Sequence, residues 1–128
     1  MKYNLFLDDV RQPHQVTWLD LPLVEWKIVR SFDQFITYIK LHGVPQTVAF
    51  DHDLDPKHYT QSDAFWSNDP DAHIGEPTGM DCVKWLVEFC HEHNHAFPTY
   101  YLHTLNDAGK KNMDSYIYSA LKSENIHQ

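Results

Sequence analysis

The chain has few of the residues that would cross-link a small protein or anchor it in a membrane. Its 128 residues include two cysteines, Cys82 and Cys90. In a predicted helix these thiols are separated by about 12 Å of helix rise, too far for a disulfide. The N-terminal apolar run is short and is closed by Asp8 and Asp9, which predicts neither a signal peptide nor a membrane span. We therefore expect a reduced, cytoplasmic protein.

Basic residues are also scarce. The sequence contains 10 Lys and Arg against 18 Asp and Glu, for a formal net charge of −8 with histidine neutral. Proteins that wrap duplex DNA need a basic surface to neutralise phosphates, so we do not expect a duplex DNA partner. A small phosphate ligand held through a bound cation remains compatible with this charge.

Apolar segments and helical periodicity predict one α/β domain spanning residues 1–128. Strands are predicted at 3–7, 26–29, 47–50 and 98–103. Helices are predicted between Ser31 and Gly43, over 80–93, and from a cap at Asn106 or Asp107 onward. This alternation indicates a parallel sheet covered on both faces. Residues 11–23 have weak periodicity and two prolines, and residues 55–77 are polar enough to predict an inserted loop.

Polar residues follow three of the predicted strands. Asp8 and Asp9 follow the first, "DHD" at 51–53 follows the third, and His103 with Thr104 ends the fourth. In an open α/β sheet, ligands bind outside the carboxyl ends of the strands, where strand order reverses. These groups are therefore expected to meet in one crevice.

Carboxylates that converge at a sheet edge raise one another's pKa values or share a cation. Oxygen ligands suit a hard ion such as Mg²⁺ or Mn²⁺, completed by a substrate phosphate. The predicted metal ligands are Asp8, Asp9, Asp51 and Asp53. The alternative is that the three acids at 51, 53 and 55 are turn-forming residues without a ligand.

The predicted catalytic residues are His52, His103, Thr104 and Asn106. The two histidines are suited to proton transfer near neutral pH, and the hydroxyl and amide could hydrogen-bond a phosphoryl oxygen. Arg11 and Lys110 are candidates to bind the substrate phosphate. Arg11 could instead pair with Asp9, and Lys110 could be a solvated surface residue.

A His-Glu-x-x-His match at 91–95 is not interpreted as a zinc site. Its two histidines lie on the polar face of the predicted helix, which ends within a few residues. No acidic helix follows that could supply a third ligand.

Four motifs together resemble a known family. "FLDDVRQP", "AFDHDL", "TGMDCVKWL" and "YLHTLN" are similar to the cyclic-phosphate-processing receiver-like domain family, an offshoot of the response-regulator receiver fold, over about residues 2–122 apart from 55–77. The resemblance implies Mg²⁺ held at Asp8, Asp9 and Asp51, with a receiver-type hydroxyl at Thr104. It also implies histidines at 52 and 103 and an amide at 106 that ordinary receivers lack.

The resemblance implies a receiver-like (flavodoxin-like) doubly wound parallel sheet of about four strands, without the fifth strand and helix. The missing strand carries the lysine that contacts an acyl phosphate in receivers, which disfavours a phosphorylation switch.

The predicted function is a metal-dependent phosphoesterase acting on cyclic phosphates, such as RNA 2′,3′-cyclic ends or cyclic nucleotides, in RNA repair or phage–host conflict. The alternative is a non-catalytic module that binds a nucleotide or a protein partner. A homodimer could cover the open sheet edge.

Overall fold

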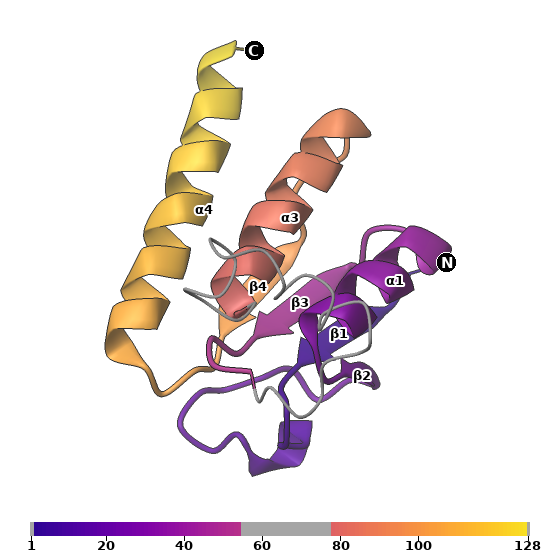
Figure 1. Cartoon of the computed structure of the whole chain (residues 1–128), viewed down its shortest axis with the longest axis vertical. Coiled ribbons are helices and arrows are strands. Elements are labelled where there is room, and N and C mark those ends of the chain that lie inside the picture. Colours follow the sequence, from indigo (N-terminus) through magenta and orange to yellow (C-terminus); the bar gives the residue numbers. More distant parts are fainter. Residues whose placement is uncertain (1, 55–77, 128) are drawn as a thin grey trace, which may run out of the picture.

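The computed structural model describes residues 2–54 and 78–127, with side chains as far as Lys122 (Figure 1). The predicted boundaries of strands and helices agree with it to within one residue. The elements in chain order are β1 (Asn4–Leu7), the 3-10 helix η1 (Pro13–Gln15), β2 (Trp26–Val29), α1 (Phe32–His42), β3 (Thr47–Phe50), α3 (Gly79–Glu92), β4 (Thr99–Leu102) and α4 (Asp107–His127). The loop predicted at 55–77 lies outside the described residues.

The four strands form one parallel sheet in the order β2-β1-β3-β4. The chain crosses from β2 back past β1 to β3, so the order reverses beside β1. The last residues of three neighbouring strands are aligned, because Leu7 pairs with Phe50 and Phe50 pairs with Leu102. This is the predicted receiver-like architecture, and residues 2–54 and 78–127 contain no fifth strand.

Helices α1, α3 and α4 lie on one face of the sheet (Figure 1), and the main hydrophobic core is formed by side chains of that face and of these helices. Alternation along each strand sends every second side chain to this face. The buried side chains that meet there come from the strands (Leu5, Leu7, Val29, Val48, Phe50, Leu102) and from the helices (Phe35, Ile39, Cys82, Val83, Leu86, Cys90, Met113, Ile117). Both cysteines are buried within this core.

None of the described α-helices contributes to the hydrophobic cluster on the opposite face of the sheet. Phe6 and Ala49 on that face pack against Val16, and the partly buried Leu19 and Leu21 extend the cluster. The crossover from β1 to β2 has only the single turn η1 as regular structure. Both faces are thus covered, as predicted, but the second is covered by an irregular segment whose prolines and weak periodicity disfavour a helix.

Side-chain caps fix the starts of α1 and α3. The Ser31 side chain accepts a hydrogen bond from the backbone N–H of Gln34, but the Gln34 side chain accepts from Arg30 rather than Ser31. A capping box between Ser31 and Gln34 is therefore only half formed. At α3, Thr78 and Asp81 form both hydrogen bonds of a capping box.

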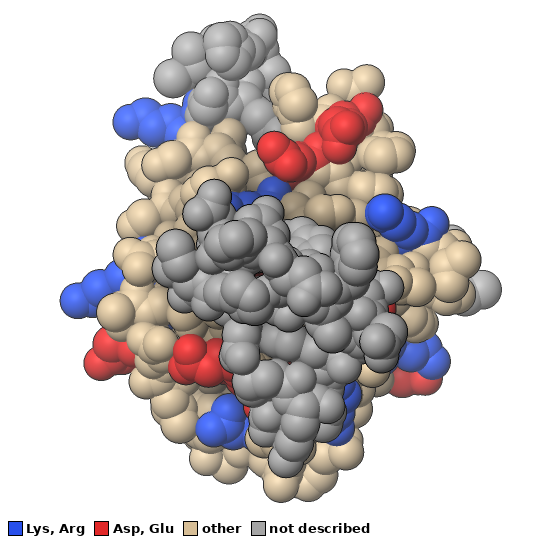
Figure 2. Space-filling view, viewed as in Figure 1, with Lys and Arg blue, Asp and Glu red and all other residues tan. Residues whose placement is uncertain are grey.

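The outer surface carries charges of both signs. On the face drawn in Figure 2, the basic side chains of the described residues stand apart among acidic ones instead of forming a continuous stripe. None of the described helices has an apolar stretch sufficient to cross a bilayer.

Candidate functional site

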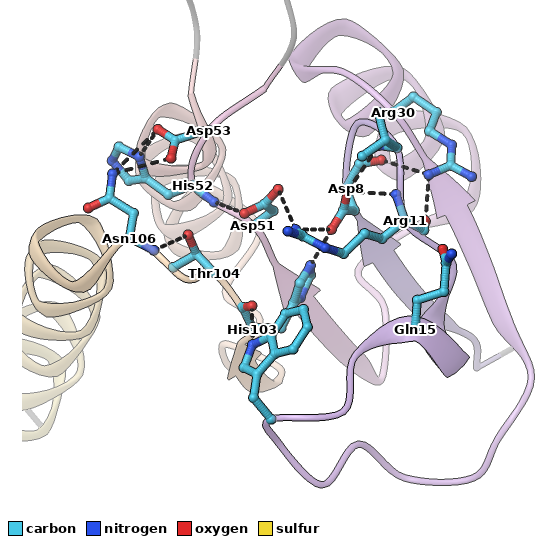
Figure 3. Close-up of polar contacts among 12 residues, drawn as sticks. Asp8, Arg11, Gln15, Arg30, Asp51, His52, Asp53, His103, Thr104 and Asn106 are labelled. Carbon is cyan, nitrogen blue, oxygen red and sulfur yellow. Dashed lines mark hydrogen bonds and ion pairs between the residues drawn. The ribbon is translucent and has the colours of Figure 1, made fainter.

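Three buried polar side chains occupy equivalent positions at the ends of three neighbouring strands (Figure 3). Asp8, Asp51 and His103 each follow one of the paired residues Leu7, Phe50 and Leu102. The backbone ladder continues through them, because the N–H of Asp51 donates to Leu7 and the N–H of His103 donates to Phe50. Since alternate residues of a strand point to opposite faces, this register directs all three side chains to the same side of the sheet.

Asp8 is fully buried and fully hydrogen-bonded. Its Oδ1 accepts from the backbone N–H groups of Val10 and Arg11 at 3.0 and 2.9 Å, and its Oδ2 lies 3.0 Å from Nε2 of His103. Burial by itself would raise the pKa of Asp8, but the hydrogen bonds from His103 and the two backbone amides outweigh burial and hold the pKa well below its usual value. The folded structure therefore favours the ionised form of Asp8.

Asp51 has the opposite electrostatic environment. Burial and the neighbouring charge of Asp8 raise the pKa of Asp51 from 3.8 to about 6. The charge of His103, the backbone N–H of His52 and the hydroxyl of Thr104 act in the other direction without compensating fully. Because the effects that disfavour the charged form of Asp51 exceed those that favour it, an added positive charge nearby would stabilise its carboxylate.

His103 is buried completely and its ring stacks on Phe6, with centroids 4.6 Å apart and planes 8° apart. Its Nε2 faces Asp8, and its backbone carbonyl accepts a hydrogen bond from Nε1 of Trp18 at 2.8 Å. Within the described part of the chain, Nδ1 of His103 is buried without a hydrogen-bond partner. The His103 side chain therefore orients Asp8 through the contact of Nε2. Because His103 is fully buried, solvent does not reach its ring.

Arg11 extends across the two carboxylates. Its Nη1 lies 3.4 Å from Oδ2 of Asp8 and 3.9 Å from Oδ2 of Asp51 (Figure 3). The guanidinium carbon also lies 5.1 Å from the ring centre of Trp18. Arg30 supports this loop by donating to the backbone carbonyls of Asp8 and Arg11. In this structure Arg11 pairs with Asp8 and Asp51, and its role in binding a substrate phosphate remains a prediction.

A second polar cluster adjoins the first. Nδ1 of His52 lies 3.0 Å from Oδ1 of Asp53, and the amide of Asn106 donates to both oxygens of Asp53 at 3.3 and 3.4 Å. The side-chain carbonyl of Asn106 caps α4 by accepting from the N–H of Gly109. The hydrogen bond with His52 is the main cause that lowers the pKa of Asp53, ahead of the opposing effect of burial. This cluster fixes the orientation of the His52 ring.

Two glycines allow the close approaches on which the site depends. A Cβ at Gly79 would lie 1.7 Å from the backbone oxygen of Asp51, so glycine lets the start of α3 pack on the end of β3. A Cβ at Gly109 would lie 2.5 Å from the His52 ring. Both glycines are buried. The close approach of Gly109 shows that the first turn of α4 packs against the His52 ring.

Most of the chain matches one protein family. The family described as "cyclic-phosphate processing receiver domain" matches residues 3–119. The chain belongs to this family. Neither the curated proteins nor the solved structures provide a match.

In this receiver domain, Asp8, Asp51 and His103 form the described group whose ligand atoms could hold a metal ion, with these atoms within 4.8 Å of one another. Two buried carboxylates, one with a raised pKa, suit a hard divalent cation, and an imidazole nitrogen extends the donor set toward Mn²⁺ and later transition metals. The residues present therefore fit a cation. His103 was predicted as an acid–base group, and its place in this set was missed.

The remaining predicted residues lie around this group in different ways. Asp53 contacts His52 and Asn106 instead of joining the three ligand atoms. Asp9 is half-buried, and Lys110 is exposed in the first turn of α4. Thr104 is buried between the clusters, where it hydrogen-bonds Asp51 and accepts from the N–H of Asn106. The metal role of Asp9 and Asp53 and the phosphate role of Lys110 remain predictions.

Proposed function

We propose that this receiver domain is a metal-dependent phosphoesterase that opens cyclic phosphates, either RNA 2′,3′-cyclic ends or cyclic nucleotides. The observation that carries the proposal is the alignment of Asp8, Asp51 and His103 at one sheet edge, with His52 as the residue that follows Asp51. Membership in a cyclic-phosphate processing family supports the substrate class. The bound cation is supported by the two buried acids, because burial and the charge of Asp8 keep the pKa of Asp51 raised.

Asp8 and Asp51 would hold Mg²⁺ or Mn²⁺, and His103 would keep Asp8 oriented through its hydrogen bond. A bound divalent ion supplies electrostatic stabilisation of the charge that develops on the phosphoryl oxygens. Arg11 and Lys110 would bind the non-bridging oxygens of the phosphate. Thr104, held between Asp51 and Asn106, would keep the end of β4 fixed against the site.

In the proposed reaction a water oxygen bonds to phosphorus, and the bond from phosphorus to one ribose oxygen breaks. The water loses a proton, the released ribose oxygen gains one, and the product is a phosphomonoester with a free hydroxyl. His52 would carry one of these proton transfers. Because Nδ1 of His52 faces Asp53, its Nε2 is the nitrogen left for the substrate, with Asp53 and Asn106 as positioning residues.

The test uses an RNA oligonucleotide ending in a 2′,3′-cyclic phosphate and a panel of cyclic nucleotides, each with Mg²⁺, Mn²⁺ or chelator. Wild type should open the ring only with metal, and Asp51→Asn should be inactive. Asp20→Asn is the matched control, because it makes the same change at an exposed residue outside the site. Full activity of Asp51→Asn, or turnover in chelator, would contradict the proposal.

One observation favours a non-catalytic binding module as the second candidate. His103 is fully buried against Phe6 and Asp8, which leaves His52 as the histidine next to the acids with an exposed side-chain fraction. Ring opening needs one proton removed from water and one given to the ribose oxygen. A site with a single accessible acid–base histidine could therefore bind a cyclic phosphate without opening it. The same panel run as a binding assay separates the candidates, since saturable binding without turnover would establish the module.

A further inference from the structure

The position of Arg11 raises the question of what neutralises the acid pair when no divalent cation is bound. Its Nη1 faces Oδ2 of both Asp8 and Asp51, the two carboxylates assigned above to the cation. One guanidinium nitrogen therefore occupies the space between the proposed metal ligands (Figure 3).

We propose that Arg11 is an exchangeable cation: its guanidinium bridges Asp8 and Asp51 in the ion-free protein, leaves when a divalent cation binds, and then binds the substrate phosphate. This inference rests on the proposed function, because it takes the cation site from it. It adds that metal binding and phosphate recognition are linked through one side chain.

The contacts of Arg11 are those of a weak partner. The distances of 3.4 and 3.9 Å exceed the 2.7–2.9 Å typical of charge-assisted hydrogen bonds, and the Arg11 side chain is 31% exposed. A compact divalent cation can approach both oxygens closely and carries twice the charge, so it should win the competition.

Only the side chain of Arg11 has to move. Its backbone N–H donates to Asp8 and its backbone carbonyl accepts from Arg30, so the loop after β1 stays in place. Arg11 would remain beside the acids after exchange, within reach of a phosphate bound to the cation. A planar guanidinium is well suited to two oxygens of such a group.

Trp18 provides a built-in reporter. Its ring lies 5.1 Å from the guanidinium carbon of Arg11 and is 40% exposed. Its Nε1 is tied to the backbone carbonyl of His103, so the indole should keep its position when the guanidinium leaves. Removal of a cation from the ring face should change the emission of Trp18.

The experiment measures Mg²⁺ binding by calorimetry and tryptophan emission on wild type, Arg11→Gln, Trp18→Phe and Lys27→Gln. The last variant removes one positive charge at a surface residue that pairs with Glu25, which controls for net charge. Arg11→Gln should bind Mg²⁺ about tenfold more tightly, equivalent to ~1.4 kcal/mol, and Lys27→Gln should match wild type. Emission of wild type should change on Mg²⁺ addition, and this change should be absent in Trp18→Phe and Arg11→Gln.

The phosphate half is tested by adding inorganic phosphate to the Mg²⁺-loaded proteins. Arg11→Gln should bind phosphate about tenfold more weakly than wild type, because it lacks a charged donor. Unchanged phosphate affinity would overturn this half of the proposal.

The remaining outcomes separate the exchange from the proposed function. If wild type binds Mg²⁺ but Arg11→Gln binds it no more tightly, or if no emission change depends on Trp18, the exchange is overturned and the metal site stands. If wild type binds neither Mg²⁺ nor Mn²⁺, both the exchange and the metal-dependent function are overturned. If Arg11→Gln does not fold, the emission of wild type compared with Trp18→Phe decides the question.

Discussion

Replacing Asp51 by Asn should make the ion-free protein more stable at neutral pH while removing its response to Mg²⁺. Burial and the charge of Asp8 raise the pKa of Asp51 from 3.8 to about 6 in the folded protein. Between these two values the folded protein holds a proton that the unfolded chain has released. Its stability therefore falls as the pH rises through this window and stays reduced above it.

The size of the effect follows from the difference between the two pKa values. A gap of about two pH units corresponds to about 3 kcal/mol, since one unit is worth about 1.4 kcal/mol. Asp8 and His103 will adjust when the charge is removed, so we expect a gain of about 2 kcal/mol for Asp51→Asn at pH 7. In a domain of this size that gain should raise Tm by roughly 5–10 °C.

The assay is chemical and thermal unfolding in chelator between pH 4 and pH 8, repeated with Mg²⁺. Wild type should lose stability from pH 4 to pH 6 and regain it with Mg²⁺, whereas Asp51→Asn should do neither. Asp53→Asn is the control, because hydrogen bonding to His52 lowers the pKa of Asp53 and its removal should give no gain. Equal or lower stability of Asp51→Asn in chelator at pH 7 would refute the reasoning.

Three further predictions concern the supports of the site. Gly79→Ala should destabilise the fold by more than about 2 kcal/mol, measured by urea unfolding, because its Cβ would meet the backbone of Asp51; a wild-type midpoint would contradict this. Gly109→Ala should move the His52 ring and so lower kcat on a cyclic phosphate at least about tenfold; unshifted His52 ring resonances in an NMR spectrum would count against it. Ser31→Ala should cost about 1 kcal/mol by loss of the α1 cap, with unchanged activity per folded molecule; a loss of specific activity would show that this cap also serves the site.

Local sequence signals were sufficient for the elements of this fold. Phe32 to His42 carries its own start signal in Ser31 and its own stop in Gly43, whose φ of 89° favours glycine. Each strand ends at a polar residue that breaks an apolar run. Such signals depend on neighbours along the chain, so they can be read without the fold.

The sequence alone also placed acids and histidines at strand ends, and a parallel sheet brings those ends to one edge. What it did not decide was which side chains meet there. Asp53 was predicted as a metal ligand, and in the structure its carboxylate contacts His52. His103 was predicted as an acid–base group, and its imidazole lies buried against Asp8. A signal for His103 was present, because it directly follows the last strand residue, as Asp8 and Asp51 do.

That signal becomes usable only with the register, and register is a property of the assembled sheet. Pairing of Leu7 with Phe50 and of Phe50 with Leu102 determines that the next three side chains share one face, and a shift of one residue would separate them. Burial then sets the opposite pKa directions of Asp8 and Asp51. The sequence determined the elements and the residue types at the sheet edge, and the tertiary structure decided their partners, because contacts between distant strands depend on alignment and burial that no local segment contains.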